Sequence, residues 1–437
     1  MTGRASSRRR VTERVTIGKA GGRPWPFPSF FLGGFECSTH RRPDGRRLDL
    51  IAATRHDTMA AEDYAALARH GIRGARDGAR WHLIERDPGR YDWSPVLPLV
   101  RAAKAAGVRV CWDLCHYGHP DHVDPMAPGF ADALARYADA FVRLLEEEEG
   151  GPPLLCPVNE MSFWSWAGGE VAYFNPGVRD RGGDLKGRLV EASLAAGRAA
   201  RAAVPGTMLL SVDPLINVLP HRPEDGETAR AYHATQWDAW DGLLGRWWPD
   251  LGGDADGFDV MGVNYYWNNQ WEREGEAGRT VHLGDARHRP FRELLADAHA
   301  RFGRPMIVAE TSIEGTPRAP WLRYVCEEVR AAMRAGVPVG GICLYPIVSH
   351  PGWDNDRYCP NGLFEMEIVN GRRPVDIRLA CELTRQAALF EAFGRGEAVA
   401  EEPDAGPAFA AAWQRSETLR LSGDAEAGRL QDAVGDR

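Results

Sequence analysis

The feature that most constrains the fold of this chain is an eightfold alternation of short apolar runs with longer segments of helical periodicity. The apolar runs span residues 30–35, 72–76, 108–114, 154–158, 208–212, 258–264, 306–309 and 341–345. The helical segments span residues 58–70, 94–106, 130–149, 185–203, 229–247, 291–302, 321–335 and 375–393. Apolar strands that alternate with helices are typical of a parallel sheet covered on both faces. Eight repeats predict the fold class α/β, as a single (β/α)8 TIM barrel.

An open, doubly wound sheet is the alternative architecture. No GxGxxG follows the first apolar run, so its dinucleotide-binding form has little support. Local signals also predict where two helices start: Thr58 is expected to be an N-cap, and Pro95 to occupy the first position of another helix. Four tryptophans in the segment 229–247 and just after it are expected to pack along one helix; they are Trp237, Trp240, Trp247 and Trp248.

The ends of the chain differ in composition from the alternating part. Residues 1–25 are expected to be a disordered leader, residues 26–395 the catalytic barrel, and residues 396–437 a loosely packed or disordered tail. The Arg- and Ser-rich start has no apolar stretch after its charges, which argues against a secretory signal. No apolar run of about 18 residues predicts a membrane span. A cytoplasmic location is therefore expected.

The net charge and the cysteine content limit the kinds of binding partner that the chain is expected to have. The chain has 53 Lys+Arg against 61 Asp+Glu, a net charge of −8, which argues against a nucleic-acid partner. Eight cysteines show no disulfide framework and no CxxC pair, so buried free thiols are the favoured interpretation. We expect no cofactor and no metal; the oligomeric state is not indicated.

Two glutamates stand where barrel chemistry is expected. Glu160 follows the run 154–158, and Glu310 follows the run 306–309. Residues at the C-terminal ends of barrel strands meet at one face, where active sites of this fold lie. A carboxylic acid that protonates a leaving oxygen and a carboxylate that attacks the sugar are what glycoside hydrolysis needs. The pair therefore predicts a glycosidase.

Seven segments, in their order over residues 28–390, resemble the family 1 β-glycosidases among the clan A glycoside hydrolases. They are FLGG at 31–34, RDGARW at 76–81, LCHY at 114–117, NE at 159–160, GVNYY at 262–266, the glutamate at 310 and NGLF at 361–364. The resemblance implies a retaining enzyme that cleaves a small glycoside through a covalent glycosyl-enzyme. In it, Glu160 would be the acid/base and Glu310 the nucleophile.

The resemblance also implies supporting roles. Arg76 would lie beside Glu310 and hold it ionised, and Tyr266 (or Tyr265) would hydrogen-bond it. Asn159 would bind the sugar's 2-hydroxyl, and His116 another ring hydroxyl. Further residues expected to bind substrate are Asn264, Tyr345, Trp353, Glu36, His40 and Trp164.

Two segments depart from the family pattern. The glutamine expected after the first run is missing, so Glu36, His40 or Arg41 would take its place. After the last run, Gly352 stands where the family has a glutamate that binds sugar hydroxyls. A plain glucose or galactose substrate is therefore in doubt, and Arg41 or Arg357 could favour an acidic or phosphorylated sugar. The bond between Tyr345 and Pro346 is predicted to be cis.

Three other functions remain open. A transglycosidase would use the same site with a different acceptor. A non-catalytic carbohydrate-binding barrel would explain the two departures. A metal-dependent barrel enzyme would use clustered His and Asp residues of the loop after the third run, namely His116, His119, His122, Asp113, Asp121 and Asp124.

Overall fold

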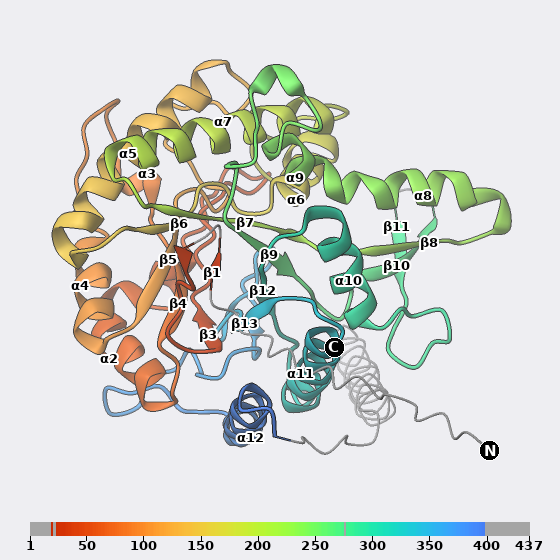
Figure 1. Ribbon diagram of the computed structural model, residues 1–437. Helices are drawn as coiled ribbons and strands as arrows, with labels where there is room; N and C mark the ends of the chain where they lie inside the picture. The colour runs from red at the N-terminus through yellow and green to blue at the C-terminus, as the bar shows by residue number, and fades with distance from the viewer. Residues whose placement is uncertain (1–18, 21–22, 275–276, 398–437) are drawn as a thin grey trace, which may run out of the picture.

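A computed structural model describes residues 19–20, 23–274 and 277–397 of the chain. Eight parallel strands close into a barrel in the order β12-β13-β3-β4-β5-β6-β7-β9 (Figure 1). In chain order they are β3 Phe31–Gly34, β4 Gly74–Gly78, β5 Arg109–Asp113, β6 Leu154–Cys156, β7 Met208–Pro214, β9 Val260–Asn264, β12 Met306–Thr311 and β13 Val339–Leu344. Each predicted apolar run overlaps one of these strands, and the predicted (β/α)8 barrel is confirmed.

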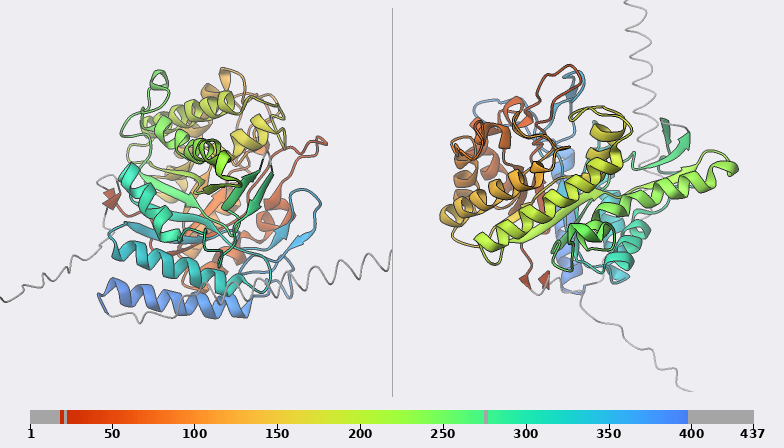
Figure 2. Two further views of the ribbon diagram at one scale, coloured as in Figure 1. Left: turned by 90° about the vertical axis from the view of Figure 1, so that its right-hand side faces the viewer. Right: turned by 90° about the horizontal axis from the view of Figure 1, so that it is seen from above.

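Helices surround the barrel (Figures 1 and 2). The long ones are α2 His56–Arg69, α4 Leu97–Ala106, α5 Gly129–Glu149, α7 Gly182–Ala203, α10 Phe291–Phe302, α11 Arg318–Arg334 and α12 Ile377–Gly394. The short ones are α1 Leu50–Ala53, α3 Trp81–Ile84 and α6 Met161–Trp164, the last continued by a π-helical turn, Ser165–Glu170. Each long helix starts within three residues of its predicted segment and ends within one.

The predicted helix over 229–247 is wrong in detail. The segment divides into α8 Gly226–Ala234, a 3₁₀ turn Thr235–Trp237 and α9 Asp238–Leu243. The four tryptophans therefore do not share one helix: Trp247 and Trp248 follow it, and Trp247 is half exposed. The turn carries Gln236, a buried side chain that accepts from the Ile216 N–H. Gly245, in a left-handed conformation, lies just beyond the end of the last helix.

The two predicted helix starts are also corrected. The helix α2 begins at His56, two residues before Thr58, because the His56 ring is held by Asp63 from inside the helix. Pro95 lies in a turn before α4, and Pro98 occupies its first turn, where a missing N–H costs nothing.

Apolar side chains fill the barrel and the layer between strands and helices. The interior cluster includes Leu32, Cys111, Leu210, Ile307 and Cys343, all fully buried. Seven of the eight cysteines are buried, Cys381 is exposed, and no two cysteines form a disulfide in the described part of the chain. No helix among the described residues is long and apolar enough to span a bilayer.

Smaller sheets lie outside the barrel. β8 (Asn217–Pro220), β10 (Gln270–Glu274) and β11 (Ala277–Thr280) form a three-stranded sheet beside α8, outside the ring of helices (Figures 1 and 2). The pairs β1 Lys19–Ala20 with β2 Arg23–Pro24, and β14 His350–Pro351 with β15 Tyr358–Cys359, are two-stranded. Most of the expected leader, and the expected tail beyond Glu397, lie outside the described residues.

Candidate active site

Glu160 stands just beyond β6. The strand ladder continues past Cys156, since the N–H of Asn159 donates to Cys115 and that of Glu160 to Val212, each at 3.0 Å. Glu160 itself adopts a left-handed backbone with φ 44° and begins α6. Residues with a side chain rarely adopt this conformation, and such residues cluster at functional sites. The turn directs the glutamate away from the strand and toward the barrel mouth.

Two neutral donors hold the carboxylate of Glu160. Tyr117 donates from its hydroxyl to Oε2, and Asn264 donates from Nδ2 to Oε1 at 2.7 Å. The side chain is 8% exposed. Burial, followed by the negative charge of Glu310, raises the pKa of Glu160 above its ordinary value, despite these two donors. A buried carboxyl group of this kind stays protonated at neutral pH and can donate a proton.

Glu310 lies on β12, paired in register with Asn264 of β9. Its two oxygens have different donors: Arg76 Nη1 binds Oε1 at 2.8 Å, and the Tyr266 hydroxyl binds Oε2 at 2.9 Å. A cation and a hydroxyl that donate to separate oxygens fix the position of a carboxylate. The two glutamates are therefore in opposite settings, one with neutral donors and one with a buried arginine.

Arg76 connects three strands under the mouth. Besides Glu310, it donates from Nη2 to Asp113 at 2.6 Å and to the Asn159 oxygen at 2.7 Å. Its guanidinium lies 5.2 Å from the ring centre of Tyr345. Burial lowers the pKa of Arg76, but the charges of Asp113 and Glu310 outweigh burial and raise it, so the side chain is a permanent cation.

His116 and Asn159 extend the hydrogen-bond network of Arg76 and Asp113. His116 Nδ1 lies 3.0 Å from Asp113 Oδ2, and its Nε2 lies 3.1 Å from Asn159 Nδ2. Because the Asn159 oxygen accepts from Arg76, its amide nitrogen is left as a donor to Nε2. Burial lowers the pKa of His116, yet the hydrogen bond and charge of Asp113 raise it above the usual value. The network fixes both side chains beside Glu160.

The residues that depart from the family pattern also gather at the mouth. Glu36 is buried, and its Oε1 accepts from the N–H and the hydroxyl of Ser38 at 2.9 and 2.5 Å. The ring centre of His40 lies 4.7 Å from that of Trp353, and its Nδ1 is buried with no hydrogen-bond partner among the described residues. The ring centre of Trp353 lies 5.8 Å from that of Tyr117. Tyr345 is buried, parallel to the His116 ring at 6.0 Å.

Two of the expected residues lie elsewhere. Trp164 is fully buried, and its indole N–H donates to the Asn175 carbonyl at 2.9 Å, so the structure places it in the core. Tyr265, the alternative partner of Glu310, instead stacks on Phe291 at 4.0 Å. Its hydroxyl accepts from Gln270.

Three residues of the site were missed as its members by sequence reasoning. They are Asp113, which binds Arg76 and His116; Tyr117, which binds Glu160; and Cys37, whose thiol lies 3.2 Å from His116 Nδ1. Asp113 is the only charged side chain near the end of the apolar run 108–114, a signal similar to the one that identified the two glutamates. Tyr117 has a left-handed backbone with φ 65°, which no feature of the sequence predicts.

The structure allows a test of the metal-dependent alternative. Among the described residues, Cys37, Asp113 and His116 offer ligand atoms within 4.8 Å of one another. Oδ2 of Asp113 already accepts a hydrogen bond from the cationic Arg76. Asn159 donates to Nε2 of His116, but a metal ion on Nδ1 would leave a hydrogen on Nε2, which then could not accept this bond. These contacts do not fit a divalent cation. His119 and His122 point to other partners, the Pro120 carbonyl and Glu85.

Other expectations around the mouth can now be checked. The Tyr345–Pro346 bond is cis, as predicted. Arg41 is paired with Asp121, and Arg357 with Glu314, each at 2.7 Å. Both guanidinium groups are therefore occupied by carboxylates of the protein. An acidic sugar gains no support from them.

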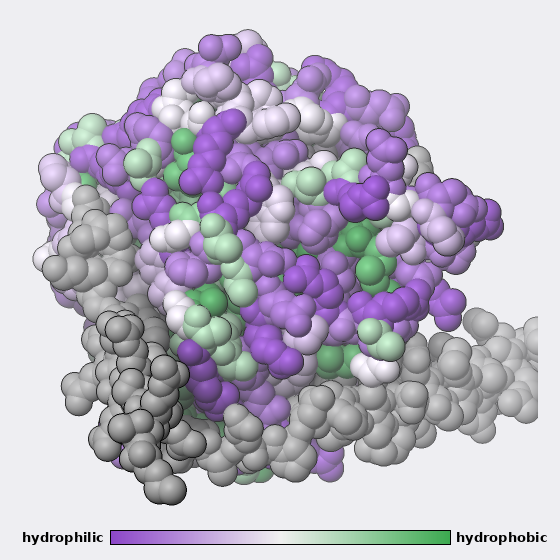
Figure 3. Space-filling model, turned by 45° about the vertical axis from the view of Figure 1, so that its right-hand side comes forward, coloured by the Kyte–Doolittle hydropathy of each residue, from purple (hydrophilic) through white to green (hydrophobic). Residues whose placement is uncertain are grey.

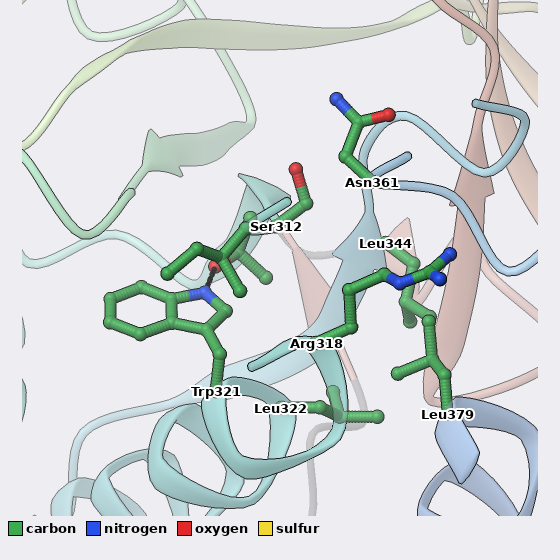
Figure 4. A pocket seen from close by; sticks show the side chains of 9 residues that line it. Ser312, Arg318, Trp321, Leu322, Leu344, Asn361 and Leu379 are labelled. Atoms are coloured by element: carbon green, nitrogen blue, oxygen red, sulfur yellow. Dashed lines mark hydrogen bonds between the residues drawn. The ribbon is translucent and has the colours of Figure 1, made fainter. Parts of the chain in front are cut away.

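A small cavity of about 20 Å³ lies beside Thr311, at the end of β12 (Figure 4). Ser312 and Asn361 line its upper part, and Trp321 donates from its indole to the Thr311 hydroxyl at 2.8 Å. A volume of about 10–15 Å³ is enough for one water molecule. The cavity can hold a single water and not a sugar, so it is not the substrate site.

No protein-family model and no curated protein sequence matches the chain. Solved structures do match. The AHE enzyme from Alicyclobacillus herbarius is 18% identical with a TM-score of 0.68, covering 85% of this chain and 99% of its own. A β-glucosidase from Thermotoga maritima, in complex with glucoimidazole, is 15% identical with a TM-score of 0.69, covering 84% and 99%. The same enzyme with castanospermine is 14% identical with a TM-score of 0.67, covering 86% and 100%.

At these identities the likeness concerns the fold. The chain thus has the glycoside hydrolase-like barrel that family 1 β-glucosidases have, as the sequence resemblance implied.

Proposed function

We propose that this protein is a retaining glycoside hydrolase of the β-glycosidase type that acts on a small glycoside. The observation that carries the proposal is the contrast between two neighbouring glutamates. Glu310 has an arginine and a tyrosine on its carboxylate, and Glu160 has two neutral donors and a raised pKa. One group is suited to attack as a carboxylate, and the other to donate a proton.

The reaction runs in two steps at this pair. Glu310 attacks the anomeric carbon while Glu160 protonates the departing oxygen, so a glycosyl ester forms and the glycosidic bond breaks. The ester removes the negative charge of Glu310, which is the second cause of the raised pKa of Glu160. Glu160 then ionises more readily and takes a proton from the attacking water. Arg76 and Tyr266 hold the attacking oxygens in place throughout.

The glycone is expected to be neutral. Glu36, Asp113 and Glu310 bring carboxylates to the mouth, and the buried cation Arg76 is already bound by two of them. An anionic sugar would meet uncompensated negative charge. His40, whose Nδ1 has no partner within the described ranges, and Glu36 supply polar atoms for sugar hydroxyls.

Mass spectrometry of trapped intermediates tests the proposal. Wild type and Glu310→Ala are incubated with activated 2-deoxy-2-fluoro glycosides of several neutral sugars, because the fluorine slows both steps and lets the ester accumulate. The expected result is a mass increase of one fluorosugar on the wild type only. Glu160→Ala, the matched variant, should still form the adduct with a good leaving group. No adduct with any sugar, and no hydrolysis of aryl glycosides, would reject the proposal.

An acceptor other than water would make the same enzyme a transglycosidase. Product analysis with added alcohols separates the two outcomes.

A further inference from the structure

Asp213 is a buried carboxyl group near the end of β7 that has no role in the reaction described above. Its side chain is fully buried, whereas the surface of the molecule is largely hydrophilic in the view of Figure 3. A carboxylate in the interior is costly unless it is paired with a cation or well hydrogen-bonded. A carboxyl group at this position therefore costs stability whenever it ionises.

The hydrogen bonds of Asp213 come from the turn that carries Glu160. The N–H of Ser162 donates to Oδ1 of Asp213 at 3.0 Å, and the hydroxyl of Ser162 donates to Oδ2, also at 3.0 Å. One residue earlier on β7, the carbonyl of Val212 accepts from the N–H of Glu160 at 3.0 Å. Two consecutive residues of β7 thus hold Glu160 and the residue two places after it.

These bonds hold a backbone conformation that a glutamate rarely adopts. Glu160 has φ 44° and ψ 61°, in the left-handed region. Such a conformation costs free energy and persists only where the surroundings hold it in place. Without the bonds to Ser162, the turn would relax toward ordinary backbone angles, and the carboxyl group of Glu160 would move away from Tyr117 and Asn264, which bind it.

The charge of Asp213 is not neutralised by a direct ion pair within the described ranges. Lys186, on α7, is the cation that faces it, but its Nζ is bound to the Thr235 carbonyl at 2.9 Å and to Asp238 at 3.3 Å. Burial raises the pKa of Asp213 to about 7, so the group is mainly an anion in mildly alkaline solution. Burial and then Glu310 raise the pKa of Glu160 most, and the charge of Asp213 adds to them.

Other groups also face Glu160 from the elements packed around it. They are Glu310 on β12, Tyr117 after β5, Tyr266 after β9 and the uncharged Asn264 on β9. Arg76 on β4 and His116 after β5 lie one contact further away, bound to Glu310 and to Asn159. A variant that removes only the charge of Asp213 leaves all of these groups in place.

We propose that Asp213 is a positioning residue of the acid/base glutamate: it holds the turn of Glu160 through Ser162, and its negative charge favours the protonated form of Glu160. The role in catalysis rests on the proposed function, whereas the link between the two carboxyl groups does not.

Carbon NMR of labelled glutamate carboxyl groups tests this link without turnover. Glu160 is titrated in wild type, in Asp213→Asn and in Asp259→Asn, and Glu160→Gln assigns its signal. Asparagine keeps an acceptor for the N–H of Ser162 but removes the charge, so the pKa of Glu160 should fall in Asp213→Asn. Asp259 is the matched control, because it also accepts a backbone N–H, that of Leu209 at 2.8 Å, but it precedes β9, at the opposite end of the barrel. Asp259→Asn should leave the pKa of Glu160 unchanged.

Urea unfolding separates a positioning role from a structural one. The folded-state pKa of Asp213 is raised, so its ionised form destabilises the fold as the pH rises through about 7. Asp213→Asn should therefore be at least as stable as wild type at about pH 8. A loss of stability in this variant would overturn the inference, because it would assign Asp213 a structural role.

Kinetics place the residue in the reaction. In Asp213→Asn the alkaline limb of kcat/KM should move to lower pH, since Glu160 loses its proton more readily. Asp213→Ala also removes the bonds to Ser162, so kcat/KM should fall about 100-fold for alkyl glycosides, which need the acid. For dinitrophenyl glycosides, whose leaving group needs no proton, the fall should be less than about tenfold.

An unchanged pKa of Glu160 in Asp213→Asn would overturn the inference whether or not the protein hydrolyses glycosides. Equal losses of kcat/KM for the two classes of glycoside in Asp213→Ala would overturn it as well, because a misplaced acid affects mainly the poor leaving groups. A lowered pKa of Glu160, together with no hydrolysis of any glycoside by the wild type, would reject the proposed function and support the link between Asp213 and Glu160.

Discussion

His56 gives the sharpest prediction about stability, because it is buried between two carboxylates. Its Nδ1 lies 2.8 Å from Asp63 and its Nε2 3.0 Å from Asp77, and the ring is parallel to Phe35 at 3.6 Å. Arg373 binds the far side of Asp63 at 2.7 Å. Burial lowers the pKa of His56, but the charges and hydrogen bonds of the two aspartates raise it to about 9. The histidine is therefore a cation in the folded protein at neutral pH.

The sign of the pH effect follows from the raised pKa. In the unfolded chain the pKa is about 6.5, so the stabilisation by the charged ring is complete below that pH and is lost as the pH rises through about 9. A rise of this size corresponds to about 3 kcal/mol of unfolding free energy. Burial also raises the pKa of Asp213, to about 7, and such carboxyls lower stability as the pH rises through neutrality. A variant is needed to separate the contributions.

The perturbation is His56→Gln, which keeps hydrogen bonding and removes the charge. Urea unfolding of wild type and variant is measured across the pH range, and the difference in unfolding free energy is plotted against pH. We expect a difference of about 3 kcal/mol at about pH 6 that nearly vanishes at about pH 10. Contributions from Asp213 and other groups cancel in the difference. A difference that stays constant with pH would refute the reasoning, since it would mean that His56 is neutral in the fold.

Three further predictions concern the site. Tyr117→Phe removes a donor that favours the ionised form of Glu160, so the pKa of Glu160 should rise and the alkaline limb of kcat/KM should move to higher pH in pH–rate profiles. Arg76→Met leaves Asp113 and Glu310 buried without a cation, so we expect a loss of about 3–5 kcal/mol in urea unfolding and a fall in kcat of at least about 100-fold. Gly78→Ala would place a Cβ 2.4 Å from that of Cys37, so denaturation should show a loss of about 1–3 kcal/mol, whereas Gly129→Ala, which meets open space, should not.

Local sequence already determined much of this protein. The eight strands and seven of the eight predicted helical segments follow from apolar periodicity, which depends on each residue and its near neighbours. The positions of Glu160 and Glu310 follow as well, because a carboxylate at the end of an apolar strand must lie where the strand meets solvent or a site. The failed segment, 229–247, has helical spacing, but its turn at Gln236 is set by a backbone N–H 20 residues away in sequence.

The contacts between residues that are distant in sequence depend on closure of the barrel. Arg76 meets Asp113, Asn159 and Glu310 at separations of 37, 83 and 234 residues, and the choice among its possible partners depends on which strands become neighbours. Trp164 looked like a residue of the mouth because it follows Glu160 closely, but its position within α6 turns it into the core. Periodicity determines what each segment becomes, whereas pairings between distant side chains exist only after the chain has closed.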